Sequence, residues 1–85
     1  MRVEVTSRFA KHYHRLPSKV QAQVKKAIGY LKEDWHHPSL RVKKVRGKKD
    51  LWEGRVTRFY RLTFTIEEGV IFLETVGPHN KAFKK

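Results

Sequence analysis

The spacing of the apolar residues changes once along this chain, and that change limits the possible folds more than any other feature. Between Val20 and Trp35, apolar residues recur every three or four positions, which predicts a helix with one buried face. Between residues 51 and 76 the chain is rich in β-branched and aromatic residues, and it alternates with polar ones in places, which predicts strands. Helical spacing followed by strand spacing favours an α+β fold, with helices packed on one face of a sheet.

A short strand and a first helix are predicted at the start of the chain. Val3 and Val5 alternate with polar residues, as in a half-buried strand. Thr6 or Ser7 offers an N-cap hydroxyl for a helix that Pro17 ends.

The strongest helix signal begins at Ser18. Ser18 and Gln21 have the spacing of a capping box, in which two side chains bind orphan backbone N–H groups at a helix start. This second helix is expected to fray near Asp34, because Pro38 prevents its continuation. The two helices then form a helical hairpin.

The second half is predicted to form a three-stranded antiparallel meander. Arg58 and Phe59 mark the first turn, and residues 67–69 mark the second. The segment Val70 to Val76 is almost continuously apolar, so we expect a central strand, buried on both faces, that residues 77–78 stop. A chain of 85 residues is expected to form one domain, residues 1–85.

Alternation along these strands separates the two faces of the sheet. Trp52, Gly54 and Val56 share one face, as do Leu62, Phe64 and Ile66. The face away from the helices is expected to carry Glu53, Arg55, Arg61 and Thr63.

The charge of the chain indicates a polyanionic partner. Lys and Arg number 20 against 8 Asp and Glu, a formal net charge of +12. Nucleic acid is the leading candidate, ahead of an acidic protein or a membrane surface. Six of the nine residues from 41 to 49 are basic: Arg41, Lys43, Lys44, Arg46, Lys48 and Lys49. We expect this stretch to contact phosphates, and the alternative is a solvated connecting loop.

Two arginines and one histidine are the candidates for chemistry on a phosphate. Arg55 and Arg61 are predicted on neighbouring strands, where their planar guanidinium groups could hold a phosphate. The alternative is that one or both pair with Glu53, Glu74 or a terminal carboxylate for structure. His79 follows the strand breaker at 77–78, and a histidine at a sheet rim can transfer a proton at neutral pH, although a surface histidine without function is the alternative.

The other histidines are weaker candidates. His12 and His14 are predicted on the exposed side of the first helix. His36 and His37 follow the second helix, and with Asp34 they form too sparse a cluster to predict a metal site. No metal is therefore expected.

Aromatic residues beside basic ones suit single-stranded RNA, because bases stack on them. Phe59, at the predicted turn beside Arg58, and Phe83, in the same tail as Lys81, are the candidates. Phe59 could equally fold back onto apolar neighbours. The chain has no cysteine, no apolar run of membrane-spanning length and no signal-peptide pattern at its start, so we expect a cytoplasmic protein without a membrane partner.

The run from Leu51 to Phe64 resembles the signature of the RelE/ParE toxin superfamily. That signature has an aromatic residue, then a basic residue, a turn, and an aromatic residue followed by Arg-Leu. Residues 38–40 and 44–47 resemble the family's loop after the helical hairpin, and residues 76–81 resemble its closing strand and tail. The match is to the RelE, YoeB and HigB branch.

The resemblance implies the toxin of a type II toxin–antitoxin module. Such toxins enter the ribosomal A site, contact ribosomal RNA there and cleave mRNA without a metal or other cofactor, and an acidic antitoxin blocks them. By position, Arg61 matches the family's phosphate-binding arginine and Arg55 a basic residue on the preceding strand. His79 matches a candidate general acid, Glu53 is a candidate base, and Phe83 lies near a tail tyrosine but has no hydroxyl.

Two other functions fit the same resemblance and charge. One is a ParE-like toxin that inhibits DNA gyrase, since a shared fold does not determine function. The other is a noncatalytic basic domain that binds nucleic acid.

Overall fold

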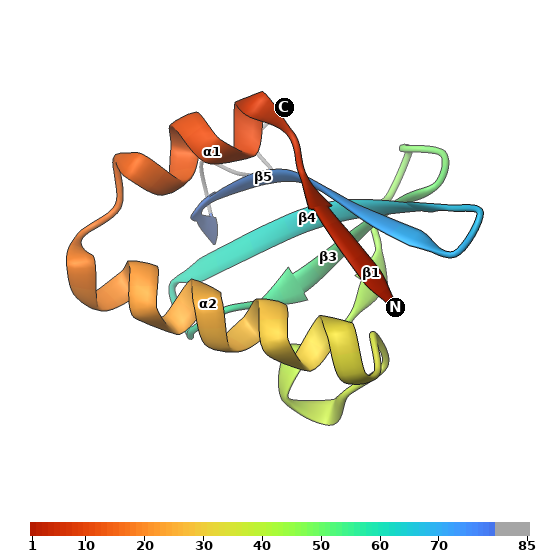
Figure 1. Ribbon diagram of the computed structural model, residues 1–85, viewed down its shortest axis with the longest axis horizontal. Coiled ribbons are helices and arrows are strands. Elements are labelled where there is room, and N and C mark those ends of the chain that lie inside the picture. The colour runs from red at the N-terminus through yellow and green to blue at the C-terminus, as the bar shows by residue number, and fades with distance from the viewer. Residues whose placement is uncertain (80–85) are drawn as a thin grey trace.

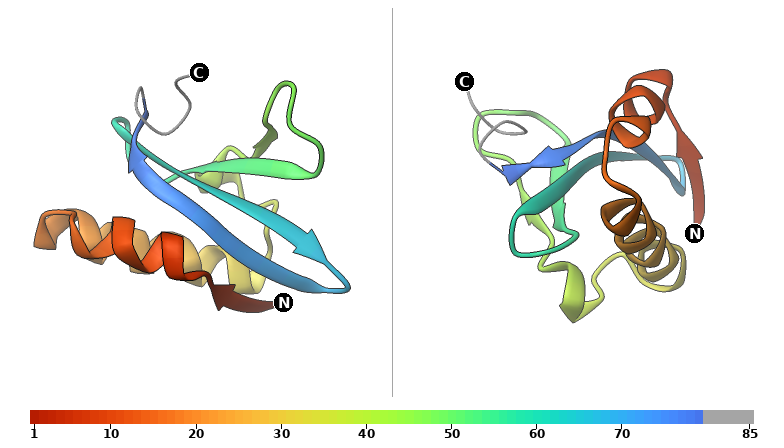
Figure 2. Two further views of the ribbon diagram at one scale, coloured as in Figure 1. Left: turned by 90° about the horizontal axis from the view of Figure 1, so that it is seen from above. Right: turned by 90° about the vertical axis from the view of Figure 1, so that its left-hand side faces the viewer.

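The computed structural model describes residues 1–79, and within them a five-stranded mixed sheet carries both helices on one face (Figures 1 and 2). The elements in order are β1 (Arg2–Val5), α1 (Ser7–His14), α2 (Ser18–Glu33), a 3₁₀ turn η1 (Pro38–Leu40), β2 (Lys43–Lys44), β3 (Leu51–Arg55), β4 (Tyr60–Glu67) and β5 (Val70–Pro78). The strand order in space is β1-β5-β4-β3-β2. The α+β arrangement predicted from the change of period is confirmed.

The antiparallel meander β3–β4–β5 is extended by a strand on each side. β1 pairs in parallel with β5, and β2 pairs antiparallel with β3. β2 was not predicted, because its two residues lie in the basic stretch and show no alternation. β5 is an inner strand, as expected, but it continues to Pro78 instead of stopping at Gly77, since Pro78 at the strand end still pairs with Tyr60.

The start of α1 agrees with the sequence and the start of α2 does not. Thr6 is the N-cap of α1: its Oγ1 accepts a hydrogen bond from the Phe9 backbone N at 3.2 Å. The predicted capping box of α2 is wrong, because Pro17 is the N-cap and makes no side-chain bond. Gln21 instead donates from Nε2 to the carbonyl oxygen of Tyr13 at 2.9 Å. That carbonyl, near the end of α1, also accepts from the Leu16 backbone N at 3.1 Å, and the short connection brings it within reach of Gln21.

The core lies between the helices and the sheet. Its fully buried side chains are Phe9, Val24, Leu31, Leu40, Leu62, Phe64, Ile71 and Leu73. Gly54 permits close packing there: a Cβ at this position would lie 3.3 Å from Leu62 Cδ1 and 3.9 Å from the Leu40 carbonyl oxygen. A side chain at Gly54 would therefore press on Leu62, whereas its contact with η1 would be an ordinary one.

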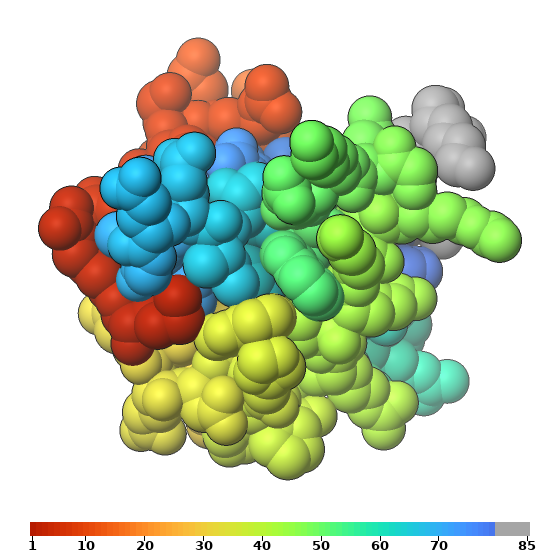
Figure 3. Space-filling model, turned by 90° about the vertical axis from the view of Figure 1, so that its right-hand side faces the viewer, coloured from red at the N-terminus to blue at the C-terminus, as the bar shows by residue number. Residues whose placement is uncertain are grey.

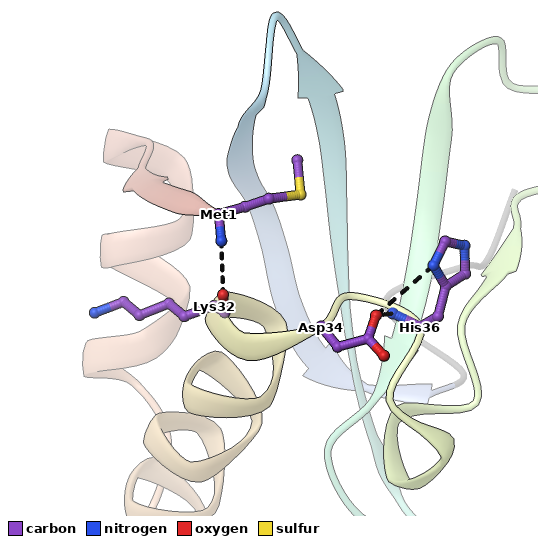
Figure 4. Close-up of polar contacts among 4 residues, drawn as sticks. All are labelled: Met1, Lys32, Asp34 and His36. Atoms are coloured by element: carbon purple, nitrogen blue, oxygen red, sulfur yellow. Dashed lines mark hydrogen bonds and ion pairs between the residues drawn. The ribbon is translucent and has the colours of Figure 1, made fainter.

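The end of α2 is held by the first residue of the chain (Figure 4). The Met1 amine donates to the Lys32 carbonyl oxygen at 2.6 Å, which satisfies one of the last carbonyls of the helix. Beyond the helix, Asp34 Oδ1 accepts from the His36 backbone N at 3.0 Å and shapes the turn toward η1. Across residues 1–79, neither helix has the length and apolar character needed to span a membrane.

Candidate functional site

The sheet face without helices carries two adjacent rungs of polar residues. Arg55 of β3 lies directly opposite Arg61 of β4. The next rung on the same face pairs Lys43, Glu53, Thr63 and Thr75 across β2 to β5. Rungs two residues apart lie about 7 Å from each other along a strand. The register agrees with the predicted face for Glu53, Arg61 and Thr63, and the candidate residues gather at one end of the sheet.

The side chain of Arg61 is anchored by one of its nitrogen atoms. Nη1 donates to the carbonyl oxygens of Thr57 at 2.7 Å, Arg58 at 3.2 Å and Tyr60 at 3.2 Å, all in or beside the β3–β4 turn. Within residues 1–79, neither Nε nor Nη2 of Arg61 has a hydrogen-bond or ion-pair partner. The Nε–Nη2 edge, which can hold a phosphate through two parallel bonds, is therefore available to a ligand.

Neither arginine is paired with an acid inside the described part of the chain. The ion pairs there are Arg2 with Glu4 and Asp34 with His36. Glu74 instead accepts a hydrogen bond from Thr65 Oγ1 at 3.2 Å. The structural alternative for Arg55 and Arg61, pairing with Glu53 or Glu74, is not what residues 1–79 show.

Arg55 differs from Arg61 in its surroundings. It lines a cavity of about 240 Å³ together with Lys26 and Tyr30 of α2 and Ser39 of η1. Arg55 therefore borders the helix layer, whereas Arg61 is held at the β3–β4 turn. The register places the two arginines opposite each other, and their convergence on one phosphate stays a prediction.

Glu53 is a buried carboxylate on the face that no helix covers. Its exposure is 6%, and Thr63 opposite it is 2% exposed. Within residues 1–79, Glu53 makes neither a hydrogen bond nor an ion pair, although Lys43 lies opposite it on β2. No buried side-chain oxygen or nitrogen in the described residues lacks a hydrogen-bond partner, so the carboxylate oxygens of Glu53 still reach solvent and are open to a ligand.

His79 lies beside the same turn that anchors Arg61. Its backbone N donates to the Phe59 carbonyl oxygen at 2.7 Å, directly after β5 ends. The structure thus brings His79, Arg61, Arg55 and Glu53 to one end of the sheet. Lys81 and Phe83 lie outside the described residues.

The β3–β4 turn exposes an aromatic ring next to a cation. The ring of Phe59 is 67% exposed, and Arg58 Cζ lies 5.6 Å from its centroid. Thr57 Oγ1 fixes the turn, because it accepts from the backbone N of Phe59 at 3.1 Å and of Tyr60 at 3.2 Å. The alternative that Phe59 folds back onto apolar neighbours is wrong.

The basic side chains of residues 41–49 are exposed, but they point to different sides of the molecule. Figure 3 shows this segment spread over much of one side of the molecule and protruding from it. Lys43 shares the face of Glu53, whereas Lys44 lies opposite Trp52 with Nζ 5.7 Å from the Trp52 ring. The remaining basic residues, Arg41, Arg46, Lys48 and Lys49, are exposed in the flanking loops. Only part of the stretch can therefore reach the two polar rungs.

His12 was wrongly predicted on the exposed side of α1. It is half-buried against β5, and its Nδ1 accepts a hydrogen bond from the Val76 backbone N at 3.3 Å. Burial, together with the nearby charges of Arg15 and Arg8, lowers the pKa of His12 from the ordinary 6.5. The signal that could have placed it is its position one helical turn after the buried Phe9.

The other histidines form no metal centre within the described part of the chain, where no group of three or more His, Asp or Glu side chains could hold an ion. His14 is exposed, as predicted. His37 accepts at Nδ1 from the Ser39 backbone N at 3.1 Å and stacks on Tyr30, with ring centroids 4.1 Å apart. These contacts give His37 a role in shaping the segment after α2.

No family model and no curated protein sequence matches this chain. Solved structures do match. YafQ from E. coli has a TM-score of 0.80 at 13% identity, covering 98% of this chain and 99% of that one. The RelB–RelE complex from Methanococcus jannaschii contains a chain with a TM-score of 0.76 at 16% identity, covering 93% of each. The E. coli RelBE complex gives 0.72 at 25% identity, covering 91% of this chain and 94% of that one.

Proposed function

We propose that this chain, which has the fold of the RelE/ParE toxin superfamily, is the toxin of a type II toxin–antitoxin module and cleaves mRNA on the ribosome. The solved structures with this fold include antitoxin–toxin complexes, which supports a toxin. One observation carries the catalytic part of the proposal. The rung of Arg55 and Arg61 lies beside Glu53 and beside His79 at one end of the sheet, where Arg55 also borders α2.

The proposed reaction needs three kinds of group. The RNA 2′-hydroxyl attacks the adjacent phosphorus, the bond to the 5′-oxygen breaks, and a 2′,3′-cyclic phosphate and a 5′-hydroxyl result. A base takes the hydroxyl proton, cations stabilise the charge on the phosphate, and an acid protonates the leaving oxygen.

This chain offers candidates for each role. Arg61 would bind the phosphate through Nε and Nη2, since its Nη1 is engaged by the turn carbonyls. Arg55, opposite it, would add a second cation. Glu53 is the candidate base and His79 the candidate acid, and the scheme requires no metal ion.

Flanking surfaces would hold the RNA around that site. Phe59 with Arg58 offers a ring for base stacking at the edge of the site. Lys43 lies on the same face as Glu53, and the exposed basic residues around it would contact phosphates of mRNA or ribosomal RNA. Lys81 and Phe83 remain candidates of the same kind in the tail.

An acidic antitoxin would be the protein partner. A chain with a net charge of +12 favours an acidic segment that is disordered alone and folds upon binding. Such a segment would inhibit the toxin if it covered Arg61 and Arg55 or displaced the tail.

The test is cleavage of a defined mRNA on purified ribosomes, with new ends mapped by primer extension. Arg61→Ala should lower cleavage by about 100-fold or more, because one charge-stabilising group is lost. Arg2→Ala removes the same charge from β1, far along the sheet, and should leave cleavage within about twofold.

Full cleavage by the Arg61→Ala variant would overturn the site. If the wild-type protein leaves mRNA intact but inhibits DNA supercoiling by gyrase, the ParE-like function replaces this proposal. If it does neither and still binds RNA, the noncatalytic function does.

A further inference from the structure

A cavity of about 570 Å³ lies between α1 and the end of β5, on the helix side of the sheet. Arg8, His12 and Arg15 contribute its polar lining, and Leu16, Tyr60 and Pro78 contribute apolar surface. Its volume falls in the range of sites for small organic ligands. None of these residues has a role in the cleavage scheme.

The three basic residues of the cavity lie on one side of α1 and its C-cap residue, Arg15. His12 is four residues after Arg8 and three before Arg15, and residues so spaced are neighbours on a helix surface. Within residues 1–79, the guanidinium groups of Arg8 and Arg15 make no hydrogen bond or ion pair. Two charges of one sign at a cavity wall without an acid beside them favour an anionic ligand.

His12 adds a third donor, because its tautomer is determined by β5. The backbone N–H of Val76 can only donate, so Nδ1 of His12 is unprotonated and the ring proton is on Nε2. Within residues 1–79, Nε2 has no hydrogen-bond partner. Burial and the two arginines lower the pKa of His12, which keeps this tautomer neutral at pH 7.

Two residues that line the cavity are direct sequence neighbours of candidate active-site residues. Tyr60 precedes Arg61 on β4, Pro78 precedes His79 after β5, and Tyr60 and Pro78 are paired across the two strands. An RNA strand with one phosphate at Arg61 would pass the end of the sheet at this pair. An aromatic ring and apolar surface beside cationic donors suit a nucleotide, with its base on the ring and its phosphate on the donors.

We propose that this cavity is a nucleotide subsite that holds the RNA next to the cleaved phosphate, with the phosphate between Arg8, Arg15 and the Nε2–H of His12. The identification of RNA as the ligand rests on the proposed function. The site extends substrate contacts from the open face of the sheet to the helix layer.

Binding can be measured without cleavage. The probe is a fluorescently labelled all-2′-deoxy hexanucleotide, which lacks the attacking hydroxyl, and the readout is anisotropy with the full chain. Arg8→Gln with Arg15→Gln should weaken binding by about tenfold or more, because charge-assisted bonds to a phosphate are lost. Lys11→Gln with Lys19→Gln removes the same charge from exposed positions that do not line the cavity, and should change binding by about twofold or less. Equal weakening by both pairs would overturn the proposal, because it would show general attraction of the basic surface.

A second measurement locates the ligand. Titration of the full chain with uridine 5′-monophosphate should shift the NMR signals of His12 Nε2 and of the Val76 amide, and the Arg8→Gln, Arg15→Gln variant should lose these shifts. Absence of the shifts in the wild-type protein overturns the subsite. It is also overturned if the variant binds the hexanucleotide normally but binds an acidic peptide more weakly, since the cavity would then be a protein contact. If the shifts appear but ribosome-bound mRNA is not cleaved, the nucleotide site stands and the proposed cleavage function fails.

Discussion

The two faces of the β-sheet differ in what they contribute, although they are formed by the same strands. Along β4, Leu62 and Phe64 are fully buried under the helices, whereas Arg61 and Thr63 alternate with them on the other face. The helix face holds the apolar core, with cavities lined by basic residues at its edge, whereas the open face carries Glu53, which is 6% exposed, and Arg61, which has no acid partner in the described part of the chain. Because successive residues of a strand point to opposite faces, neighbouring positions on β4 contribute either to the stability of the core or to the candidate site.

The largest effect that tests this comparison is the loss of an aromatic ring from the helix face. Phe64→Ala should lower the free energy of unfolding by about 3–5 kcal/mol, because Phe64 is fully buried and its removal leaves a cavity. Phe59→Ala removes the same side chain where it is 67% exposed, and should change stability by about 0.5 kcal/mol or less. Urea denaturation of both variants measures the difference, and similar losses for the two would contradict the assignment of the core.

A smaller effect is expected from a hydroxyl pair on the open face. Thr63 and Thr75 share a hydrogen bond between their Oγ1 atoms, and Thr63 is 2% exposed. Thr63→Val should cost about 1 kcal/mol, because it leaves the Thr75 hydroxyl unpaired, and adding Thr75→Val should restore part of this loss. Thermal unfolding of the single and double variants gives the comparison. If the double variant loses the sum of two independent effects, the pair does not stabilise this face.

The smallest effect is a pH dependence on the helix side. Because the pKa of His12 is lowered from 6.5, the unfolded chain binds this proton more readily than the folded chain does. The contribution of His12 to stability should therefore be constant above pH 6.5 and fall as the pH drops from there through the lowered pKa. His12→Gln should flatten the profile of unfolding free energy just below pH 6.5. His14→Gln, which changes an exposed histidine of the same helix, should leave the slope as in the wild type.

Much of the fold could be predicted because the spacing of apolar residues indicates which side chains are buried. The stripe of α2 and the turns at residues 56–59 and 68–69 lie where the pattern placed them. β2 could not be predicted, since its two exposed lysines show no alternation of apolar and polar residues and pair with β3 through the backbone. The capping box failed for a similar reason: Gln21 binds a carbonyl of α1 that only the tertiary arrangement brings close.

The sequence indicated which residues belong to the candidate site, but it did not indicate the contacts that these residues make. Alternation placed Arg55, Arg61 and Glu53 on one face, and the register does pair Arg55 with Arg61, but Arg55 also borders α2. No pattern in the sequence indicates that Arg61 binds three turn carbonyls, because that contact depends on the conformation of the turn. The cavity beside His12 escaped prediction because it forms between α1 and β5, which are far apart in the sequence.

The central claim is that Arg55 and Arg61 act on the same phosphate, and a double-mutant cycle on mRNA cleavage tests it most directly. The cleavage rate on ribosomes is measured for Arg55→Ala, Arg61→Ala and the double variant. Groups that support one phosphate are coupled, so the combined loss should be smaller than the product of the single losses by about fivefold or more. Single losses that multiply, or an unchanged rate for either single variant, would contradict the claim.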